Sequence, residues 1–438
     1  MITKADALVE VIDYVEEKFH NGRKAFIPGD IIPVSGAVID QSDILAVVRA
    51  ALDGWFTEGK ISAEFGKELC KYIGARHVTL CNSGSSASLL AVSALSEDCF
   101  KDGKVITCAT GFPTTVAPII QNNLTPLFVD VDPKTLNANM EQVYEALENR
   151  DVCGIIMAHT LGFPYDSFGI QDTVRDLGKW FVEDIADALG AEINDKKVGT
   201  FGDASIISFF PAHHICAGEG GAVFTNNGRL KKVIDSYGSW GRDCYCLPGQ
   251  DNTCNKRFDW EWKDLPKGWD HKYTFTRLGY NLKITELQSA LGLSQMNKID
   301  KFVKERRKNF EYLLMNLADF RGDLEFVEYA FYANPSPFGF PITVKPSAPF
   351  DRNNLVKYLE SKKIKTRPVF GGNLTRHPAF KKDKIYTPYP LSGSDYVMNN
   401  TFWIGCFPGL TIAHLDYVIE TIKKFFERKG LWTKQGRN

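Results

Sequence analysis

Three short segments of the sequence carry hydroxyl, carboxylate and imidazole groups whose types and spacing could do chemistry on a bound ligand. Residues 81–88 read CNSGSSAS, residues 182–190 read VEDIADALG, and residues 208–221 read SFFPAHHICAGEGG. Small residues and serines at the start of a helix let backbone N–H groups approach a phosphate. A carboxylate can hold a proton on a ring nitrogen, and a histidine can move a proton near neutral pH. The set predicts a site that binds a phosphorylated ring compound of the pyridoxal type.

The predicted phosphate site is built from residues in three parts of the chain. Gly84, Ser85 and Ser86 lie in a turn between an apolar run and a helix-like run. Ser208, and Asn281 in the segment LGYNLKITELQ, could add hydrogen bonds to the phosphate. Turns rich in glycine and serine are common, so the prediction rests on the combination of these pieces.

The predicted ring site uses one aromatic residue and two carboxylates. Phe112, in the segment TGFPTT, could stack on a planar ring. Asp184 ends an apolar run, where it could pair with a protonated ring nitrogen, and Asp187 could reach a ring hydroxyl. The alternative interpretations are a phenylalanine of the core and an aspartate that caps a helix.

A buried sheet is needed to position these residues, and the apolar runs predict one. Between about residues 78 and 226, seven short apolar runs alternate with helix-like stretches. The runs are VTLC, KVITC, PLFVDVD, CGIIMAHT, KWFVEDIA, ASIISFF and GAVFT. Continuous apolar strands separated by helices are typical of a mostly parallel sheet that is covered on both faces. We therefore expect an α/β fold.

The remaining patterns predict how the chain is divided. Residues 1–285 would form an N-terminal arm and a large cofactor-binding domain, including an irregular, cysteine-containing insert at 241–281. Residues 286–438 would form a helical spine and a smaller C-terminal α/β domain.

Composition narrows the classes of partner. The 438 residues contain 52 lysines and arginines against 53 acidic residues, so no strong net charge points to nucleic acid or an anionic membrane. The sequence has no apolar run long enough for a membrane span, and its start lacks the apolar core of a signal peptide. We expect a cytoplasmic protein that binds neither nucleic acid nor membranes.

In their order and spacing these segments resemble the DegT/DnrJ/EryC1/StrS family of sugar aminotransferases, over about residues 35–425. The resemblance implies the fold of fold-type I pyridoxal-phosphate-dependent transferases. It also implies a homodimer in which Asn281 serves the cofactor of the neighbouring subunit. Ordinary members carry a lysine in the motif Ser-Phe-x-x-x-Lys, which forms a Schiff base with the cofactor. Here that position is His213, which can form no Schiff base but can shuttle a proton.

The segments SFFPAHHICAGEGGAVFT, GGNLTRHPAF and TFWIGCFPGLT are similar to one branch of the family, the 3-dehydratases of 3,6-dideoxyhexose and O-antigen synthesis. Within this branch the similarity is greatest to the type acting on CDP-4-dehydro-6-deoxyglucose. It implies a lyase whose pyridoxamine phosphate amine condenses with the C4 ketone of a nucleotide-linked sugar. His213 would be the catalytic base before the C3 hydroxyl leaves. The alternatives are a cluster-free, glutamate-dependent 3-dehydratase acting on a GDP-sugar, an aminotransferase, and a non-catalytic protein of the same fold.

The resemblance further implies a 2Fe–2S cluster and a partner reductase that depends on NADH and carries a flavin and an iron–sulfur centre. Cys244, Cys246 and Cys254 match three of the four cluster ligands, but position 186, where the fourth is expected, is alanine. A 2Fe–2S cluster held by cysteines alone needs four thiolates. We predict a cluster with another fourth ligand; bound zinc, a vestigial loop and a cluster-free enzyme are the alternatives.

Three further residues are candidates for binding the substrate. Arg367 and Arg376 bracket a segment that reaches over the site in this family, and they could pair with a diphosphate. Trp55 could line the sugar or base pocket. The alternative interpretations are surface arginines and a tryptophan that packs the N-terminal arm. His159 and His214 are interpreted as structural.

Overall fold

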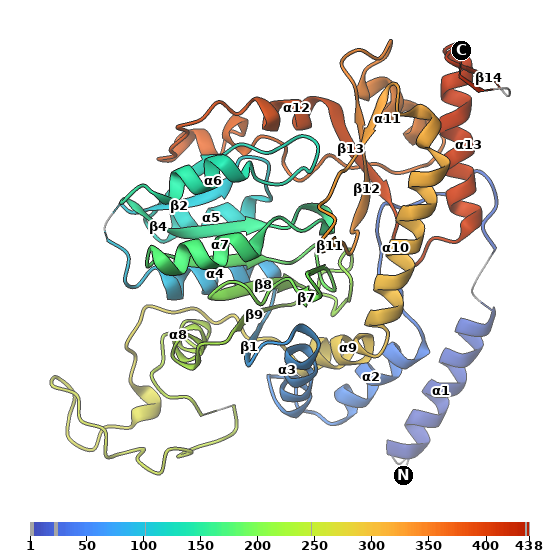
Figure 1. The fold of residues 1–438 in the computed structure, drawn as a ribbon. Coiled ribbons are helices and arrows are strands. Elements are labelled where there is room, and N and C mark those ends of the chain that lie inside the picture. Colours follow the sequence, from blue (N-terminus) through green and yellow to red (C-terminus); the bar gives the residue numbers. More distant parts are fainter. Residues whose placement is uncertain (1–3, 22–24, 101, 247, 434–435, 438) are drawn as a thin grey trace.

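The computed structural model describes residues 4–21, 25–100, 102–246, 248–433 and 436–437. Its centre is a seven-stranded sheet with helices on both faces (Figure 1). The strands, in spatial order, are β1 (His77–Cys81), β9 (Gly221–Thr225), β8 (Ala204–Ser208), β5 (Trp180–Asp184), β4 (Val152–Ala158), β2 (Lys104–Cys108) and β3 (Thr125–Val129). Only β9 runs antiparallel to its neighbours. The prediction of seven strands in a mostly parallel sheet is confirmed.

Alternation along the strands explains why both faces of the sheet are covered. In β5, Phe181 packs into one buried cluster and Val182 into the other. Because successive side chains of a strand point to opposite faces, two apolar neighbours require cover on both sides. The helices of the first half of the chain are α2 (Gln41–Leu52), α3 (Lys60–Ile73), α4 (Gly84–Leu95), α5 (Pro113–Gln121), α6 (Met140–Leu147), α7 (Ser167–Asp176) and α8 (Gly228–Gly238).

The long helical pattern after residue 285 is two helices, α9 (Glu286–Met296) and α10 (Ile299–Asn316). Figure 1 shows α10 running from beside the large sheet toward the C-terminal elements. There a smaller antiparallel sheet is formed by β10 (Leu324–Phe326), β12 (Gly339–Val344) and β13 (Thr401–Gly405). Its helices are α11 (Arg352–Ser361), α12 (Ser392–Asn400) and α13 (Ile412–Arg428). The boundary between 1–285 and 286–438 remains a prediction.

The other elements are short or peripheral. They are α1 (Lys4–Asn21), β6 (Glu192–Ile193), β7 (Lys196–Lys197), β11 (Ala333–Asn334), β14 (Trp432–Thr433) and β15 (Gly436–Arg437). The described part of the insert at 241–281 is irregular apart from one short turn of 3₁₀ helix, His271–Tyr273, and it loops away from the sheet beyond α8 (Figure 1). None of the described helices has the length and apolar character that crossing a bilayer requires.

Candidate active site

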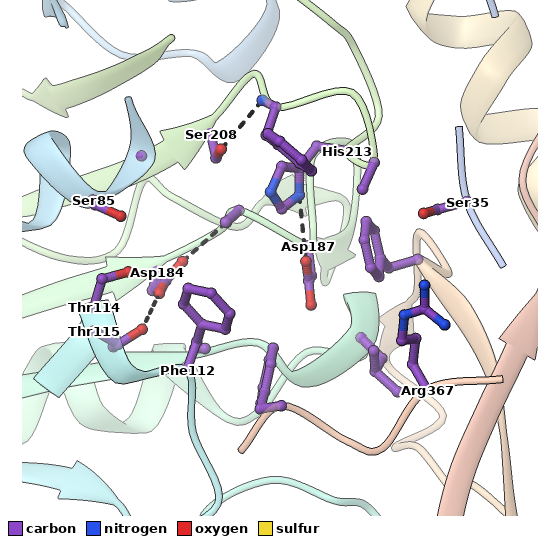
Figure 2. A pocket seen from close by; sticks show the side chains of 18 of the residues that line it. Ser35, Ser85, Phe112, Thr114, Thr115, Asp184, Asp187, Ser208, His213 and Arg367 are labelled. Atoms are coloured by element: carbon purple, nitrogen blue, oxygen red, sulfur yellow. Dashed lines mark hydrogen bonds and ion pairs between the residues drawn. The ribbon is translucent and has the colours of Figure 1, made fainter. Parts of the chain in front are cut away.

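A cavity of about 450 Å³ lies at the carboxyl ends of β4, β5 and β8 (Figure 2). Ligands of α/β proteins bind at this edge because the loops that follow parallel strands meet there. Eight of the predicted site residues line the cavity: Gly84, Ser85, Phe112, Asp184, Asp187, Ser208, His213 and Arg367. The tertiary structure thus brings together residues from positions 84 to 367 of the chain.

One end of the cavity is formed by the start of helix α4. The Ser83 hydroxyl accepts a hydrogen bond from the backbone N–H of Ser86 at 3.1 Å and caps the helix. A Cβ atom on Gly84 would lie 2.5 Å from the Cβ of Ser208, so only glycine lets the helix start meet the end of β8 this closely. The unpaired N–H groups of the first helical turn, with the Ser85 and Ser208 side chains, suit an anion.

Ser86, the third residue of the predicted phosphate turn, lies in the first turn of α4. Its hydroxyl donates to the side-chain oxygen of Asn82 at 2.6 Å, and Ser86 does not line the cavity. The same hydroxyl accepts a hydrogen bond from the Ser83 hydroxyl at 3.0 Å, so it is used within the cap of α4. Its role in binding phosphate remains a prediction.

The Asp184 carboxylate, at the end of β5, is buried beside the cavity. Its Oδ2 accepts a hydrogen bond from the Thr115 hydroxyl at 2.7 Å, and its Oδ1 accepts one from the backbone N–H of Ala186 at 3.1 Å. Burial raises the pKa of Asp184 to about 6, although the bond from Thr115 favours the charged form. A cationic ring nitrogen in the cavity would offset the cost of burying this charge. Thr115 lies in the TGFPTT segment but was not singled out from the sequence.

His213 and Asp187 face each other across a short gap (Figure 2). The Nδ1 atom of His213 lies 3.4 Å from Oδ1 of Asp187. Within the described residues, neither this Nδ1 nor Oδ2 of Asp187 has a hydrogen-bond partner. Buried polar atoms normally have partners, so this pair indicates a place where a polar ligand completes the site. The Asp187 carboxylate favours a proton on Nδ1, which leaves Nε2 as the basic nitrogen.

The two other histidines considered from the sequence are structural in their surroundings. His214 is buried, and its Nε2 lies 3.1 Å from the backbone carbonyl of Ser336. Burial lowers its pKa well below the ordinary value, so the imidazole is neutral. His159 is also buried and pairs with Glu183 at 3.3 Å. Neither histidine lines the cavity.

Of the three predicted substrate-binding residues, one reaches the cavity within its own chain. Arg367 lines it, with Nη1 donating to the carbonyl of Thr366 at 2.8 Å. Arg376 instead forms an ion pair with Asp395 on α12, away from the cavity. Trp55 is 45% exposed outside it. Roles for Arg376 and Trp55 in substrate binding therefore remain predictions.

The far wall of the cavity contains residues that the sequence did not indicate. Ser35 precedes α2, Phe338 directly precedes β12, and Trp403 lies in β13 of the smaller sheet. Phe370, in a loop, has φ of 46°, which is rare for a bulky residue, and its ring lies 6.5 Å from that of Phe112. Such backbone strain clusters at functional sites, which supports a role for this loop in the cavity.

Asn281 lies outside the cavity of its own chain. Its side-chain oxygen accepts a hydrogen bond from the Lys283 ammonium at 2.6 Å on the surface. This position agrees with the expected service to a neighbouring subunit, which remains a prediction.

The three cysteines of the insert border one small cavity, together with His271. The Nε2 atom of His271 lies 2.6 Å from Asp243. Burial raises the pKa of Cys244. Burial also acts to raise the pKa of Cys246, but hydrogen bonds with Thr253 and Cys244 and the charge of Lys272 together lower it. Across the described ranges, however, no group of three or more histidine, cysteine or acidic side chains converges to hold a metal ion. The residues of one chain, with Ala186 in the wall of the larger cavity, do not fit a cluster held by four thiolates.

Comparison with known proteins agrees with this geometry. The sequence model of the DegT/DnrJ/EryC1/StrS aminotransferase family matches residues 38–423. The chain is 47% identical over 410 residues to the lipopolysaccharide biosynthesis protein RfbH of Salmonella typhimurium, covering 92% of this chain and 94% of that protein. It is 44% identical over 430 residues to the dTDP-4-dehydro-2,6-dideoxy-D-glucose 3-dehydratase of Saccharopolyspora spinosa, covering 97% of this chain and 92% of that enzyme.

A solved structure shares the fold. The E. coli GDP-4-keto-6-deoxy-D-mannose-3-dehydratase with bound hydrated PLP superposes with a TM-score of 0.81 at 27% sequence identity. The match covers 90% of this chain and 99% of that one. It confirms the predicted fold of fold-type I enzymes, with a large mostly parallel sheet and a smaller domain.

Proposed function

This chain belongs to the DegT/DnrJ/EryC1/StrS aminotransferase family, and we propose that within the family it is a 3-dehydratase of nucleotide-linked 4-keto-6-deoxy sugars. One observation carries the proposal. His213 stands in the cavity at the position where the family motif has its lysine. A histidine there can act as a base but cannot hold the cofactor covalently, which separates dehydration from ordinary transamination. The name of the relative from Saccharopolyspora spinosa supports the same reaction type.

The cavity fits pyridoxal or pyridoxamine phosphate. The corner at the start of α4 accepts a phosphate, because a Cβ on Gly84 would close it. The Asp184 carboxylate, with its raised pKa of about 6, lies where a protonated ring nitrogen would stabilise its charge. Phe112, 51% exposed in this chain, offers a face for stacking on the ring. When bound, the aminated cofactor supplies an amine for the sugar ketone and a ring that accepts electrons.

The side chains of the cavity then have distinct tasks. Asp184 holds the proton on the ring nitrogen, and Thr115 fixes the orientation of its carboxylate. His213 takes and returns a proton through Nε2, while the Asp187 carboxylate, 3.4 Å from Nδ1, favours a proton on that nitrogen. Returning that proton to the C3 hydroxyl would let it leave as water. Arg367 at the cavity wall can pair with a diphosphate.

For the substrate we propose CDP-4-dehydro-6-deoxyglucose, in the synthesis of 3,6-dideoxyhexoses for O-antigen. Support for the pathway comes from RfbH, whose name assigns it to lipopolysaccharide biosynthesis. The names of the two dehydratase relatives specify a dTDP-linked and a GDP-linked sugar, so the nucleotide of the substrate is the variable to test.

Replacing the C3 hydroxyl by hydrogen, as a 3,6-dideoxyhexose requires, releases water and consumes two electrons and two protons. For the source of these electrons we propose a 2Fe–2S cluster in the cysteine insert, reduced by an NADH-dependent reductase. Three thiols at Cys244, Cys246 and Cys254 support it, and a fourth ligand must come from outside position 186. Because the residues of one chain do not fit the complete cluster, no catalytic step is assigned to it.

For the assembly we propose a cytoplasmic homodimer. Asn281 lies outside the cavity of its own chain and is exposed beside Lys283, which supports a role in the site of a second copy. The other proposed partners are the NADH-dependent reductase and the nucleotide-linked sugar substrate.

The test is product analysis with purified protein, pyridoxamine phosphate and CDP-, dTDP- and GDP-linked 4-keto-6-deoxy sugars. We expect mass spectrometry to show loss of water from C3, fastest with the CDP-sugar. A 4-amino sugar as the sole product would establish an aminotransferase and overturn the proposal. Turnover sustained by glutamate alone on the GDP-sugar would establish the cluster-free 3-dehydratase.

A further inference from the structure

A single buried arginine joins the loop that carries His213 to another wall of the cavity. Arg306, on α10, is 1% exposed. Its Nη1 donates to the backbone carbonyls of Pro337 and Phe338 at 3.3 and 3.0 Å, and its Nη2 donates to the carbonyl of His213 at 3.4 Å. Phe338 lines the cavity, and its ring lies 5.3 Å from that of His213.

The surroundings of Arg306 are unusual for a buried charge. In the described ranges no carboxylate lies within ion-pair distance of its guanidinium, and its Nε has no hydrogen-bond partner. Burial lowers the pKa of Arg306 only to about 10, so it stays charged at neutral pH. A buried charge is costly unless it is paired or strongly hydrogen-bonded. Here the charge of Arg306 is stabilised by backbone carbonyls of His213 and of residues 337–338. The free energy of burying this charge therefore depends on how these two segments are placed around the cavity.

The same junction is held at a second point. Nε2 of His214 lies 3.1 Å from the carbonyl of Ser336. The segment of His213 and His214 therefore contacts residues 336–338 directly as well as through Arg306. The charged groups around this junction are Asp187 beside His213, and Arg306 and Arg307 near neutral His214. Without Arg306, the His213 backbone would lose the hydrogen bond to its carbonyl.

We propose that Arg306 is a positioning residue: it fixes the His213 loop against Phe338. The proposal rests on the proposed role of His213 as base. A displacement of about 1 Å at a reacting group can cost about 100-fold in rate. The position of His213 should thus depend on a side chain that does not itself line the cavity.

The chain offers a matched control in the next residue. Arg307 also ties backbone carbonyls together, donating to Pro335 at 2.7 Å and to Gly190 at 3.0 Å, but none of these residues lines the cavity. Arg306→Met removes the charge and keeps the length of the side chain, Arg306→Lys keeps the charge without the planar fork, and Arg307→Met is the control.

We expect Arg306→Met to lower kcat by about 10- to 100-fold with little change in KM, because the base is misplaced while the substrate contacts remain. Arg306→Lys should recover part of kcat. Arg307→Met should lower the melting temperature to a similar extent but leave kcat near wild type. If Arg306→Met does not fold, Arg306→Lys alone must still show a reduced kcat at unchanged KM. Equal effects of the two methionine variants on kcat would overturn the proposal.

A second measurement does not depend on turnover. NMR of ¹³C-labelled histidine, with His213→Gln for assignment, reports the surroundings of the His213 ring. In Arg306→Met the ring resonances of His213 should shift or broaden at a fixed pH, because the loop is no longer held against Phe338, and in Arg307→Met they should keep their wild-type positions. Unchanged His213 resonances in Arg306→Met would contradict the proposal. A wild-type protein without dehydratase activity would defeat the proposed function, yet the NMR result would still decide the role of Arg306.

Discussion

At the scale of single residues, His213 is the side chain on which the proposed chemistry depends. It lines the cavity, its Nδ1 lies 3.4 Å from Asp187, and the family resemblance implies a lysine at its position. With histidine there, pyridoxal phosphate should bind reversibly and leave on gel filtration. His213→Lys should retain the cofactor covalently after borohydride reduction and lose dehydration by about 10²- to 10⁴-fold, the usual contribution of a general base.

His213→Gln is the control for this experiment, since it removes the base without adding an amine. It should lose dehydration to the same degree and gain no covalent cofactor. Wild-type protein that gave a stoichiometric borohydride adduct on a lysine would exclude the proposed role of His213.

Asp184 gives a prediction for the dependence of stability on pH. Burial raises its pKa from 3.8 to about 6, and this difference corresponds to about 3 kcal/mol. In the cofactor-free protein this stabilisation is fully present below about pH 3.8 and is lost as the pH rises through about 6, because the folded chain must then bury a charge. Asp184→Asn cannot ionise, so its free energy of unfolding relative to wild type should rise by about 3 kcal/mol between about pH 4 and pH 7.

Urea unfolding of both cofactor-free proteins across this range measures the effect. Asp176→Asn, which changes an exposed carboxylate on α7, is the control and should follow the wild-type curve. If the free energies of unfolding of wild type and Asp184→Asn changed in parallel with pH, ionisation of Asp184 would not destabilise the folded protein.

At the scale of elements, the contact between α4 and β8 forms the phosphate corner. A Cβ on Gly84 would lie 2.5 Å from that of Ser208, so Gly84→Ala must push the helix start away from the strand end. Such overpacking costs about 1–3 kcal/mol, and we expect the Kd for pyridoxal phosphate to rise by about 10-fold or more. Titration followed by absorbance measures it.

Gly66→Ala tests whether this effect is local. Gly66 lies on α3, away from the cavity. A Cβ atom there would lie 3.0 Å from the side chain of Val78. It should lower thermal stability while leaving the Kd for the cofactor near wild type. Equal losses of affinity in both variants would mean that the corner does not bind the phosphate.

The cysteine insert is the second element with a prediction. Two thiols one residue apart suit a cluster iron better than structural zinc, which more often uses two to four intervening residues. Protein prepared without oxygen should contain iron and acid-labile sulfide in equal amounts, and Cys246→Ser should lose both. The variant should keep loss of water from C3 while losing turnover driven by a reductase. Iron-free protein with glutamate-driven turnover would replace this prediction with the cluster-free alternative.

At the scale of the whole molecule, the position of Asn281 predicts that each active site is shared between two copies. Asn281→Ala and His213→Gln homodimers should both be inactive. In a mixed dimer, one site has both defects and the other has neither. Random mixing in a symmetric dimer should therefore restore about a quarter of wild-type activity.

Activity after co-expression of the two variants, with sedimentation to confirm the dimer, checks this prediction. A dimer of His213→Gln mixed with a His213→Ala chain is the control and should stay inactive. No recovery in the Asn281→Ala mixture would place Asn281 outside the neighbouring site.

The sequence by itself determined the sheet and the edge at which the site forms. Strands buried on both faces appear as continuous apolar runs, so seven runs gave seven strands. Asp184 and Ser208 end two neighbouring parallel strands, and the carboxyl ends of such strands must share one edge. The local motif also shows His213 where the family resemblance implies a lysine. These features depend on short stretches of chain, where periodicity and spacing carry the information.

Only the tertiary structure decided which distant side chains meet. Thr115 bonds Asp184 across 69 residues, and Arg306 reaches the His213 carbonyl across 93. Arg376 forms an ion pair with Asp395 and does not line the cavity. No local pattern marks such pairs, because they follow from the packing of separate elements around the cavity. The core can be read from periodicity, whereas the fine arrangement of the site depends on contacts that form only once the whole chain has folded.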